Sequence, residues 1–249
     1  MILDCYKPVF ARRCSSNSLT VTPAAAIVTA PPFSFACWFM VNDVTNPHGL
    51  FWVFQTAVGT EYFDVTVAGN VAGDPLQARA RSVSTGSSDA RTTTPVLANV
   101  WMHATAVFAS TTDRRVYLNG GGVGSSTTLN TPLLLDGTQL ATGGIAALAG
   151  LLAWPAVWNL ELTTRDIAQL AARAPPNEVK PENRVAFWDW TGSQSEWNQG
   201  IYPGAYKLVN SGTVPVMGPG FLRRRIARPW LRSFASTGNR RRRVICGAA

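Results

Sequence analysis

Short runs of alternating apolar and polar residues, separated by turn-forming residues, make up most of this chain. The clearest run has Trp101, His103, Thr105 and Val107 on one side and Met102, Ala104, Ala106 and Phe108 on the other. A period of two residues, rich in β-branched and aromatic side chains, predicts a strand between two layers. The run 115–118 alternates in the same way and ends at Asn119-Gly120, a pair that tolerates the positive φ of a tight turn. We therefore predict a hairpin within residues 99–120.

The same pattern predicts further strands along the chain. They cover residues 19–21, 33–40, 50–54, 62–67, 76–83, 133–135, 138–142, 150–158, 185–190 and 206–212. The run 33–40 is apolar on both faces, which is typical of a central strand. Arginines alternate with apolar residues in 76–83, so we expect an edge strand whose arginines face water, followed by a polar turn at 84–89. Pro155 indicates an edge position or a bulge in 150–158.

One segment, 162–171, has the apolar spacing of a helix, with Leu162, Ile167 and Leu170 on one face. Thr163 is a good N-cap, and Asp166 three residues later nearly completes a capping box. Many short strands with Gly and Pro turns in a chain of 249 residues favour one all-β sandwich or barrel.

The net charge of +8 is concentrated at the C-terminal end of the chain. Residues 221–249 contain nine arginines and no acid, which leaves 13 basic and 14 acidic residues elsewhere. We therefore expect three parts: an N-terminal arm (1–18), a globular domain (19–215) and an arginine-rich C-terminal arm (216–249). The residues expected to anchor a partner are Arg223, Arg224, Arg225, Arg228, Trp230, Arg232, Phe234, Arg240, Arg241, Arg242 and Arg243. Basic residues mixed with apolar ones suit another protein first and nucleic acid second.

Four motifs in this order resemble those of laminin-G-like, concanavalin A-like jelly-roll domains. They lie in residues 32–39, 99–120, 150–167 and 184–190, and the resemblance covers roughly residues 17–215. It implies an antiparallel jelly-roll β-sandwich with one short helix. The residues that it marks as fold signature are Trp38, Trp101, His103, Tyr117, Asn119 and Gly120. In such a domain Trp101 and Tyr117 are core anchors, and His103 is a hydrogen-bonded structural residue.

Related jelly rolls include glycoside hydrolases, and their chemistry is not evident in this sequence. The glucanases carry an E-x-D-x-E triplet on one strand face, and the chain has no such triplet. With only His48 and His103, and without a G-x-S-x-G elbow or a phosphate-binding loop, other catalytic arrangements are equally unsupported. We therefore predict a protein that is not an enzyme.

Neither a metal nor another cofactor is predicted. Calcium needs six to eight oxygen ligands, whereas the acids of this chain are scattered, so a calcium site is conceivable but unsupported. Cys37 is expected to be a small core residue, and whether Cys5 and Cys14 pair is left open. The chain shows neither a secretory signal nor an apolar run long enough to span a membrane, so we expect cytosolic synthesis and no membrane partner.

Nine tryptophans are many for a chain of this length. We expect Trp38, Trp52, Trp101 and Trp158 in the core. The remaining aromatic cluster near the end of the domain is Trp188, Trp190, Trp197 and Tyr202. Such a cluster either stacks against sugars or packs under an arm or a neighbouring subunit.

Three hypotheses for the function follow. The first is a structural protein of a phage virion that decorates the capsid or another part of the particle, with its arms on other virion proteins or on copies of itself. Its basis is the resemblance, since phage structural proteins carry such domains, together with the two arms. The second is a carbohydrate-binding adhesion module that recognises surface glycans through the aromatic cluster. The third, a glycoside hydrolase, is disfavoured by the missing carboxylate triplet.

Overall fold

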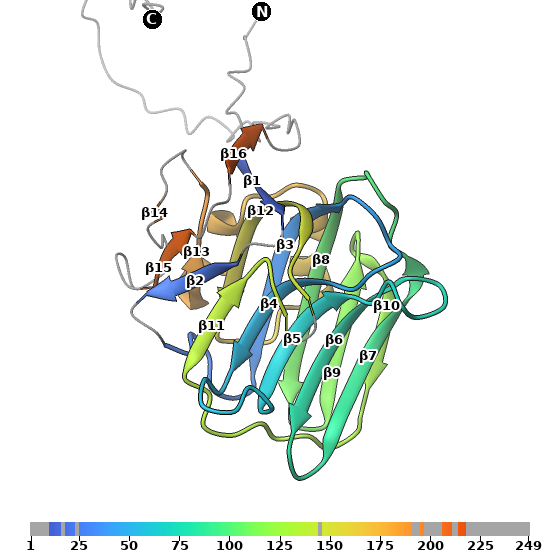
Figure 1. Ribbon diagram of the computed structural model, residues 1–249, viewed down its shortest axis with the longest axis vertical. Coiled ribbons are helices and arrows are strands. Elements are labelled where there is room, and N and C mark those ends of the chain that lie inside the picture. The colour runs from blue at the N-terminus through green and yellow to red at the C-terminus, as the bar shows by residue number, and fades with distance from the viewer. Residues whose placement is uncertain are drawn as a thin grey trace, which may run out of the picture. The chain divides into compact units, whose positions relative to one another are not determined.

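A computed structural model of the chain describes residues 10–15, 18–22, 25–143, 146–190, 195–196, 206–210 and 214–217. All of them belong to one compact unit, residues 7–221. Two antiparallel sheets face each other, and strands β4 to β7 of one sheet lie in front of β3, β8 and β9 of the other (Figure 1). The predicted all-β antiparallel sandwich with one short helix is confirmed.

The first sheet has the strand order β10-β9-β8-β3-β12-β1-β16, and β13 also pairs with β12. Its strands are β1 (Phe10–Ser15), β3 (Phe33–Val41), β8 (Met102–Ser110), β9 (Asp113–Leu118), β10 (Gly121–Ser126), β12 (Ala149–Trp158), β13 (Arg184–Phe187) and β16 (Val214–Met217). The predicted hairpin is β8 and β9, and Ala106 opposes Val116 across it. The expected bulge at Pro155 is a register shift of β12 between Ala153 and Ala156.

The second sheet has the order β14-β15-β2-β11-β4-β5-β6-β7. Its strands are β2 (Leu19–Thr22), β4 (His48–Phe54), β5 (Tyr62–Val67), β6 (Pro75–Ser82), β7 (Gly86–Pro95), β11 (Gly137–Leu140), β14 (Ser195–Glu196) and β15 (Lys207–Asn210). Every other residue of β4 to β6 points to the first sheet, because successive side chains of a strand alternate between its faces.

Aromatic rings join the two sheets in the core. Phe35 of β3 stacks on Phe51 of β4, with ring centroids 4.4 Å apart. Phe33 stacks on Phe108 at 4.6 Å, and Phe63 of the second sheet meets both rings edge-on at 5.1 Å. Large aromatic side chains bury the most apolar area per residue, so this cluster stabilises the contact between the two sheets.

Helix α1 (Thr164–Ala171) packs on the outer face of the first sheet. Ile167 and Leu170 are buried in a second apolar cluster with Tyr117 of β9 and Trp158 of β12. The predicted capping box is present, because Thr163 Oγ1 accepts from the Asp166 amide at 3.3 Å while Asp166 accepts from the Thr163 amide at 3.0 Å. Two 3-10 turns, η1 (Pro176–Glu178) and η2 (Pro181–Asn183), follow the helix.

Three expectations about strands are wrong. The edge strand expected at 76–83 is β6, which pairs with β5 on one side and β7 on the other. The polar turn expected at 84–89 is shorter, because β7 begins at Gly86 and forms the next strand of the sheet. No strand forms at 133–135.

The ends of the expected domain also shift. Residues 10–15, expected in an arm, form β1, which hydrogen-bonds to β12 and to β16 within the first sheet. β16 extends to Met217, past the expected boundary at 215. Alternation in these short segments is too brief to reveal a strand whose partners come from distant parts of the chain. Residues 1–9, 16–17 and 218–249 of the two expected arms lie outside the described residues.

Glycines allow the sandwich to close at one end, where β10 lies against β7. A Cβ on Gly124 would overlap the backbone carbonyl of Arg91, and a Cβ on Gly122 would lie 2.6 Å from Thr94 Oγ1. Beside this contact Arg114 is buried, with its guanidinium donating to Ser88 Oγ and to the carbonyls of Thr111 and Thr128. The glycine run after the hairpin is therefore a strand that must approach its neighbour closely.

Candidate functional site

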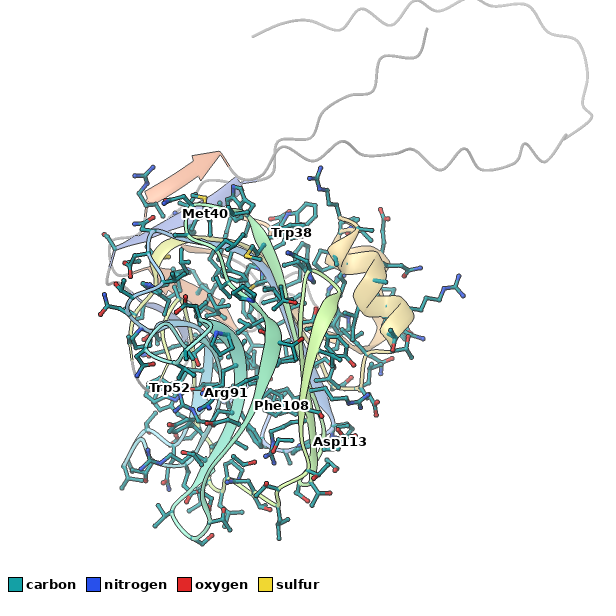
Figure 2. All side chains as sticks on the ribbon, turned by 90° about the vertical axis from the view of Figure 1, so that its right-hand side faces the viewer. Trp38, Met40, Trp52, Arg91, Phe108 and Asp113 are labelled. Atoms are coloured by element: carbon teal, nitrogen blue, oxygen red, sulfur yellow. The ribbon has the colours of Figure 1, made fainter. Side chains whose placement is uncertain are left out.

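The outer face of the second sheet carries polar and aromatic side chains in an ordered array. The residues that β4, β5, β6 and β7 direct there, which we call the polar face, are Trp52, Phe54, Tyr62, Asp64, Thr66, Gln77, Arg79, Arg81, Asp89 and Arg91. Trp52 and Arg91 lie to the left of the core residue Phe108 in Figure 2, and helix α1 lies to its right. The polar face is thus on the opposite side of the sandwich from the helix.

The strand register sorts the polar face into rows. One row runs Phe54, Tyr62, Arg81 and Ser87 across β4 to β7, and the next runs Trp52, Asp64, Arg79 and Asp89. A third contains Thr66, Gln77 and Arg91. The aromatic residues therefore gather on β4 and β5, and the arginines on β6 and β7.

Trp52 and Phe54 form the aromatic part of the polar face. Their rings stack with centroids 3.6 Å apart and planes 7° from parallel, and both side chains are half-buried. Tyr62 lies edge-on to Trp52 at 6.3 Å, and the guanidinium of Arg79 lies 5.6 Å from the Tyr62 ring centre. Trp52 was expected in the core, and that expectation is wrong, because Phe51 and Val53 take the inward positions of β4.

A buried ion pair forms the centre of the polar face. Arg79 donates from Nε to Asp64 Oδ1 at 3.2 Å and from Nη2 to Oδ2 at 2.9 Å. The side chain of Asp64 is fully buried, and that of Arg79 is 10% exposed. Burial by itself would lower the pKa of Arg79, but the charge and hydrogen bonds of Asp64 raise it, so the arginine stays charged.

Neighbouring groups extend this pair into a network. Arg91 donates from Nη2 to Asp89 Oδ2 at 2.9 Å and from Nε to Gln77 Oε1 at 2.8 Å. Asp89 Oδ1 is 4.0 Å from Arg79 Nε. The expectation that the arginines of this strand face water is therefore wrong for Arg79, whose charge is matched by acids on both neighbouring strands.

A backbone segment covers one end of the network, at Asp64 and Thr66. The Gly49 amide donates to the Ala146 carbonyl at 3.1 Å, and the Ala141 amide to the Leu50 carbonyl at 3.1 Å. A Cβ on Gly143 would lie 2.8 Å from Thr66 Cγ2 and 3.7 Å from Asp64 Oδ2, so this glycine lies directly over the acid.

Within the described residues three buried polar atoms in or beside this network have no hydrogen-bond partner: the indole nitrogen Nε1 of Trp52, the hydroxyl of Thr66 and Asp89 Oδ1. Trp52 is the cross-strand neighbour of Asp64, and Thr66 follows Asp64 on the same face of β5. Buried polar groups are hydrogen-bonded in nearly all cases, and the exceptions need an explanation such as a binding role.

The aromatic cluster expected to bind sugars is placed differently. Trp188 and Trp190 are fully buried, and both belong to the main core. Trp188 Nε1 also donates to the Tyr206 carbonyl at 3.1 Å. The expectation of an exposed platform is therefore wrong for these two residues, while Trp197 and Tyr202 lie outside the described residues. The partner-anchoring residues Arg223 to Arg243 also lie there.

The fold-signature residues of the hairpin make hydrogen bonds and packing contacts within the first sheet. The Asn119 side chain accepts from the His103 amide at 2.7 Å, and the Asn119 amide donates to the His103 carbonyl at 2.8 Å. His103 is buried edge-on to Trp38, and burial lowers its pKa to about 3, so the ring is neutral. Tyr117 is buried, whereas Trp101 is only half-buried.

Other candidate chemistry is sparse in the described part of the chain. Cys14 and Cys37 are buried free thiols, and burial raises the pKa of Cys14 to about 12, which suppresses its reactivity. Among the described residues no group of three or more His, Cys, Asp or Glu side chains is placed to hold a metal ion. None of the described helices is long and apolar enough to cross a membrane.

Sequence could have indicated part of the polar face. Arg79 and Arg81 alternate with Ala78 and Ala80, and this alternation marks a polar side of β6. No pattern distinguishes the outward Trp52 from the inward Phe51, since β4 is apolar throughout its second half. The pairing of Asp64 with Arg79 depends on the strand register. A hydrophobic pattern does not determine which residues of two neighbouring strands lie opposite each other.

Solved structures of the same fold show how widely it is used. A candidate carbohydrate-binding protein of Bacteroides ovatus superposes with a TM-score of 0.60 at 14% identity, over 85% of this chain and 60% of that one. A heptameric SAP-like pentraxin of Limulus polyphemus gives 0.59 at 12%, over 84% and 95%. The CBM40 domain of the Ruminococcus gnavus IT-sialidase, bound to α2,3-sialyllactose, gives 0.51 at 10%, over 66% and 100%.

Sequence comparison gives the family. No curated protein matches the chain by sequence. The family model of the concanavalin A-like lectin/glucanases superfamily matches residues 15–168, which include the hairpin, both strands of the buried ion pair and the start of helix α1. Because this match spans more than half of its length, the chain belongs to the concanavalin A-like lectin/glucanases superfamily.

Proposed function

We propose that this chain is a carbohydrate-binding domain and that the polar face is its sugar-binding surface. The observation that carries the proposal is the stacked, half-buried pair Trp52 and Phe54 beside the buried ion pair of Asp64 and Arg79. Sugars present apolar C–H faces and polar hydroxyls together. A surface that offers aromatic rings next to fixed charged hydrogen-bonding groups suits both.

The buried ion pair supports a binding role because its presence is poorly explained by stability. Removing a carboxylate and a guanidinium from water costs several kcal/mol per ion, and apolar residues of similar volume often stabilise a fold as well or better. Fixed charges with perturbed titration are, in contrast, frequent in functional sites. Among the described residues the indole N–H of Trp52, the hydroxyl of Thr66 and Asp89 Oδ1 are further buried polar atoms in or beside the same network that have no hydrogen-bond partner.

We infer binding without catalysis. A glycosidase needs one carboxylate free to protonate the leaving oxygen and a second on the other side of the bond. Asp64 and Asp89 are the two carboxylates of the polar face, and Arg79 lies between them and engages both. Both acids therefore hold arginines in place.

Some relatives in fold are described as binding carbohydrate, which supports the proposal at the level of the fold. Their sequence identities of 10 to 14% are too low for their binding sites to be assigned to residues of this chain. The B. ovatus structure is longer than this chain, which spans 60% of it, so its full activity is not carried over.

The test is a glycan array followed by calorimetry on hits, with the full chain. Trp52→Ala should lower affinity about tenfold, because aromatic contacts of this kind contribute about 0.5–1.5 kcal/mol beyond area burial. Trp101, a half-buried tryptophan directly before β8 of the first sheet, gives the matched control Trp101→Ala, which should bind as the wild type does. If Trp197→Ala lost binding and Trp52→Ala kept it, the result would contradict the proposal and favour the C-terminal aromatic cluster as the sugar-binding site.

Display on a phage particle remains a prediction from the sequence. It depends on the segments 1–9 and 218–249, which lie outside the described residues, and on the resemblance to phage structural proteins. A carbohydrate-binding domain displayed on a virion would satisfy both hypotheses. Co-sedimentation of the full chain with purified particles, compared with a chain that ends at residue 217, would test the anchoring role of the arginine-rich segment.

A further inference from the structure

The charges of the polar face do not cancel. It carries three arginines, Arg79, Arg81 and Arg91, and two aspartates, Asp64 and Asp89. Asp64 is held by Arg79, and Asp89 by Arg91 and more distantly by Arg79. Within the described residues Arg81 has neither a hydrogen bond nor an ion pair, and its side chain is exposed. The excess positive charge therefore lies on Arg81.

Arg81 is held close to the aromatic residues. It is the cross-strand neighbour of Tyr62, and its guanidinium carbon lies 6.0 Å from the centre of that ring. Tyr62 is in turn the cross-strand neighbour of Phe54. Two strand spacings of about 4.8 Å therefore separate the backbone of Phe54 from that of Arg81, so a group about 10 Å from the stacking site would reach the guanidinium.

We propose that the polar face selects glycans that carry an anionic substituent, a carboxylate or a sulfate, and that Arg81 is the residue that selects them. The proposal rests on the proposed function, because the sugar must be bound at Trp52 and Phe54 before Arg81 can bind its anionic substituent. The planar guanidinium fork can donate two parallel hydrogen bonds to an oxyanion, and its position 6.0 Å from the centre of the Tyr62 ring places it beside the aromatic residues.

The partners of the three arginines explain why Arg81, and neither Arg79 nor Arg91, is expected to bind the anionic substituent. Arg79 is fully engaged with Asp64, and Arg91 donates to both Asp89 and Gln77. An incoming anion would meet the carboxylate of Asp64 at Arg79 and that of Asp89 at Arg91, and each of these carboxylates competes with it for guanidinium donors. At Arg81 it meets no such competitor in the described part of the chain.

The experiment compares three probes with the same backbone: trigalacturonate, its carboxyl-reduced neutral counterpart and the O-sulfated form of that counterpart. The full chain should bind at least one anionic probe about tenfold or more tightly than the neutral one, since hydrogen bonds to charged groups contribute more than neutral ones. Arg81→Gln should abolish this difference. Arg81→Lys should retain part of it, because a lysine keeps the charge without the fork.

The control must separate Arg81 from general electrostatic attraction, since residues 221–249 hold nine arginines. Arg165→Gln on helix α1 removes the same charge from an exposed position on the opposite side and leaves the C-terminal segment intact. It should bind as the wild type does. Equal losses in Arg81→Gln and Arg165→Gln would overturn the proposal in favour of non-specific attraction.

The outcomes also separate this proposal from the carbohydrate-binding function itself. Binding of the neutral probe that depends on Trp52, without preference for either anionic probe, would overturn the role of Arg81 and leave the sugar-binding surface intact. No binding of any probe, and no hit on a glycan array, would overturn both. Preference for the carboxylate or the sulfate probe alone would identify which oxyanion the site takes.

Discussion

The buried pair of Asp64 and Arg79 gives the most demanding test of the idea that the polar face is built for binding. In Asp64→Asn the carboxylate is replaced by a neutral amide, and the buried guanidinium of Arg79 loses its close ion pair, which leaves Asp89 Oδ1 at 4.0 Å as the nearest carboxylate among the described residues. Breaking a buried pair in this way costs about 3–5 kcal/mol. The second carboxylate and the 10% exposure of the Arg79 side chain favour the lower end, about 3 kcal/mol. For a domain of this size that lowers the melting temperature by about 6–12 °C.

Removing both charges should have the opposite effect on stability. In the double variant Asp64→Leu with Arg79→Met no charge remains buried without a partner, and apolar side chains of similar volume fill the space. We expect its free energy of unfolding to lie within about 1 kcal/mol of the wild type. Glycan binding, in contrast, should weaken in the double variant, because the ion pair that orders the charged network of the polar face is gone.

The assay is urea unfolding followed by tryptophan fluorescence, with calorimetry of glycan binding on the same samples. Two results would refute the reasoning. If the double variant were as unstable as Asp64→Asn, the pair would be a structural requirement of the sheet. If it were stable and bound glycan with wild-type affinity, the pair would have no part in recognition.

Three further predictions concern the fold. Burial lowers the pKa of His103 to about 3, so below pH 6.5 the unfolded state binds a proton that the folded state does not. The wild type should therefore lose about 2 kcal/mol more than His103→Gln between pH 7 and pH 5 in urea titrations; parallel curves would contradict this. Gly124→Ala should destabilise by about 1–3 kcal/mol because its Cβ overlaps the Arg91 carbonyl, while Gly121→Ala, whose Cβ meets open space, should be near neutral. Thr163→Ala should cost about 1 kcal/mol through loss of the capping box, measured by thermal melting, and an unchanged melting temperature would argue against the cap.

The sequence by itself determined the fold class and the elements with strong local signals. The alternation of 102–108, the Asn119-Gly120 turn and the capping residues of 163–166 act between near neighbours in the chain. For this reason β8, β9 and helix α1 lie where the pattern places them. The breaks expected at Pro155 and the two-sided burial of 33–40 follow from the same local chemistry.

The tertiary structure decided which side chains became a surface. Trp188 and Trp190 look like a platform in sequence but are core residues, whereas Trp52 looks like core and lies on the polar face. Arg79 was expected in water and is buried because β7, a strand with little apolar pattern, adds beside β6 and supplies Asp89. Each outcome depends on which strands become neighbours and in what register. Strand order and register are determined by contacts between residues far apart in the chain, and an alternating pattern does not predict those contacts.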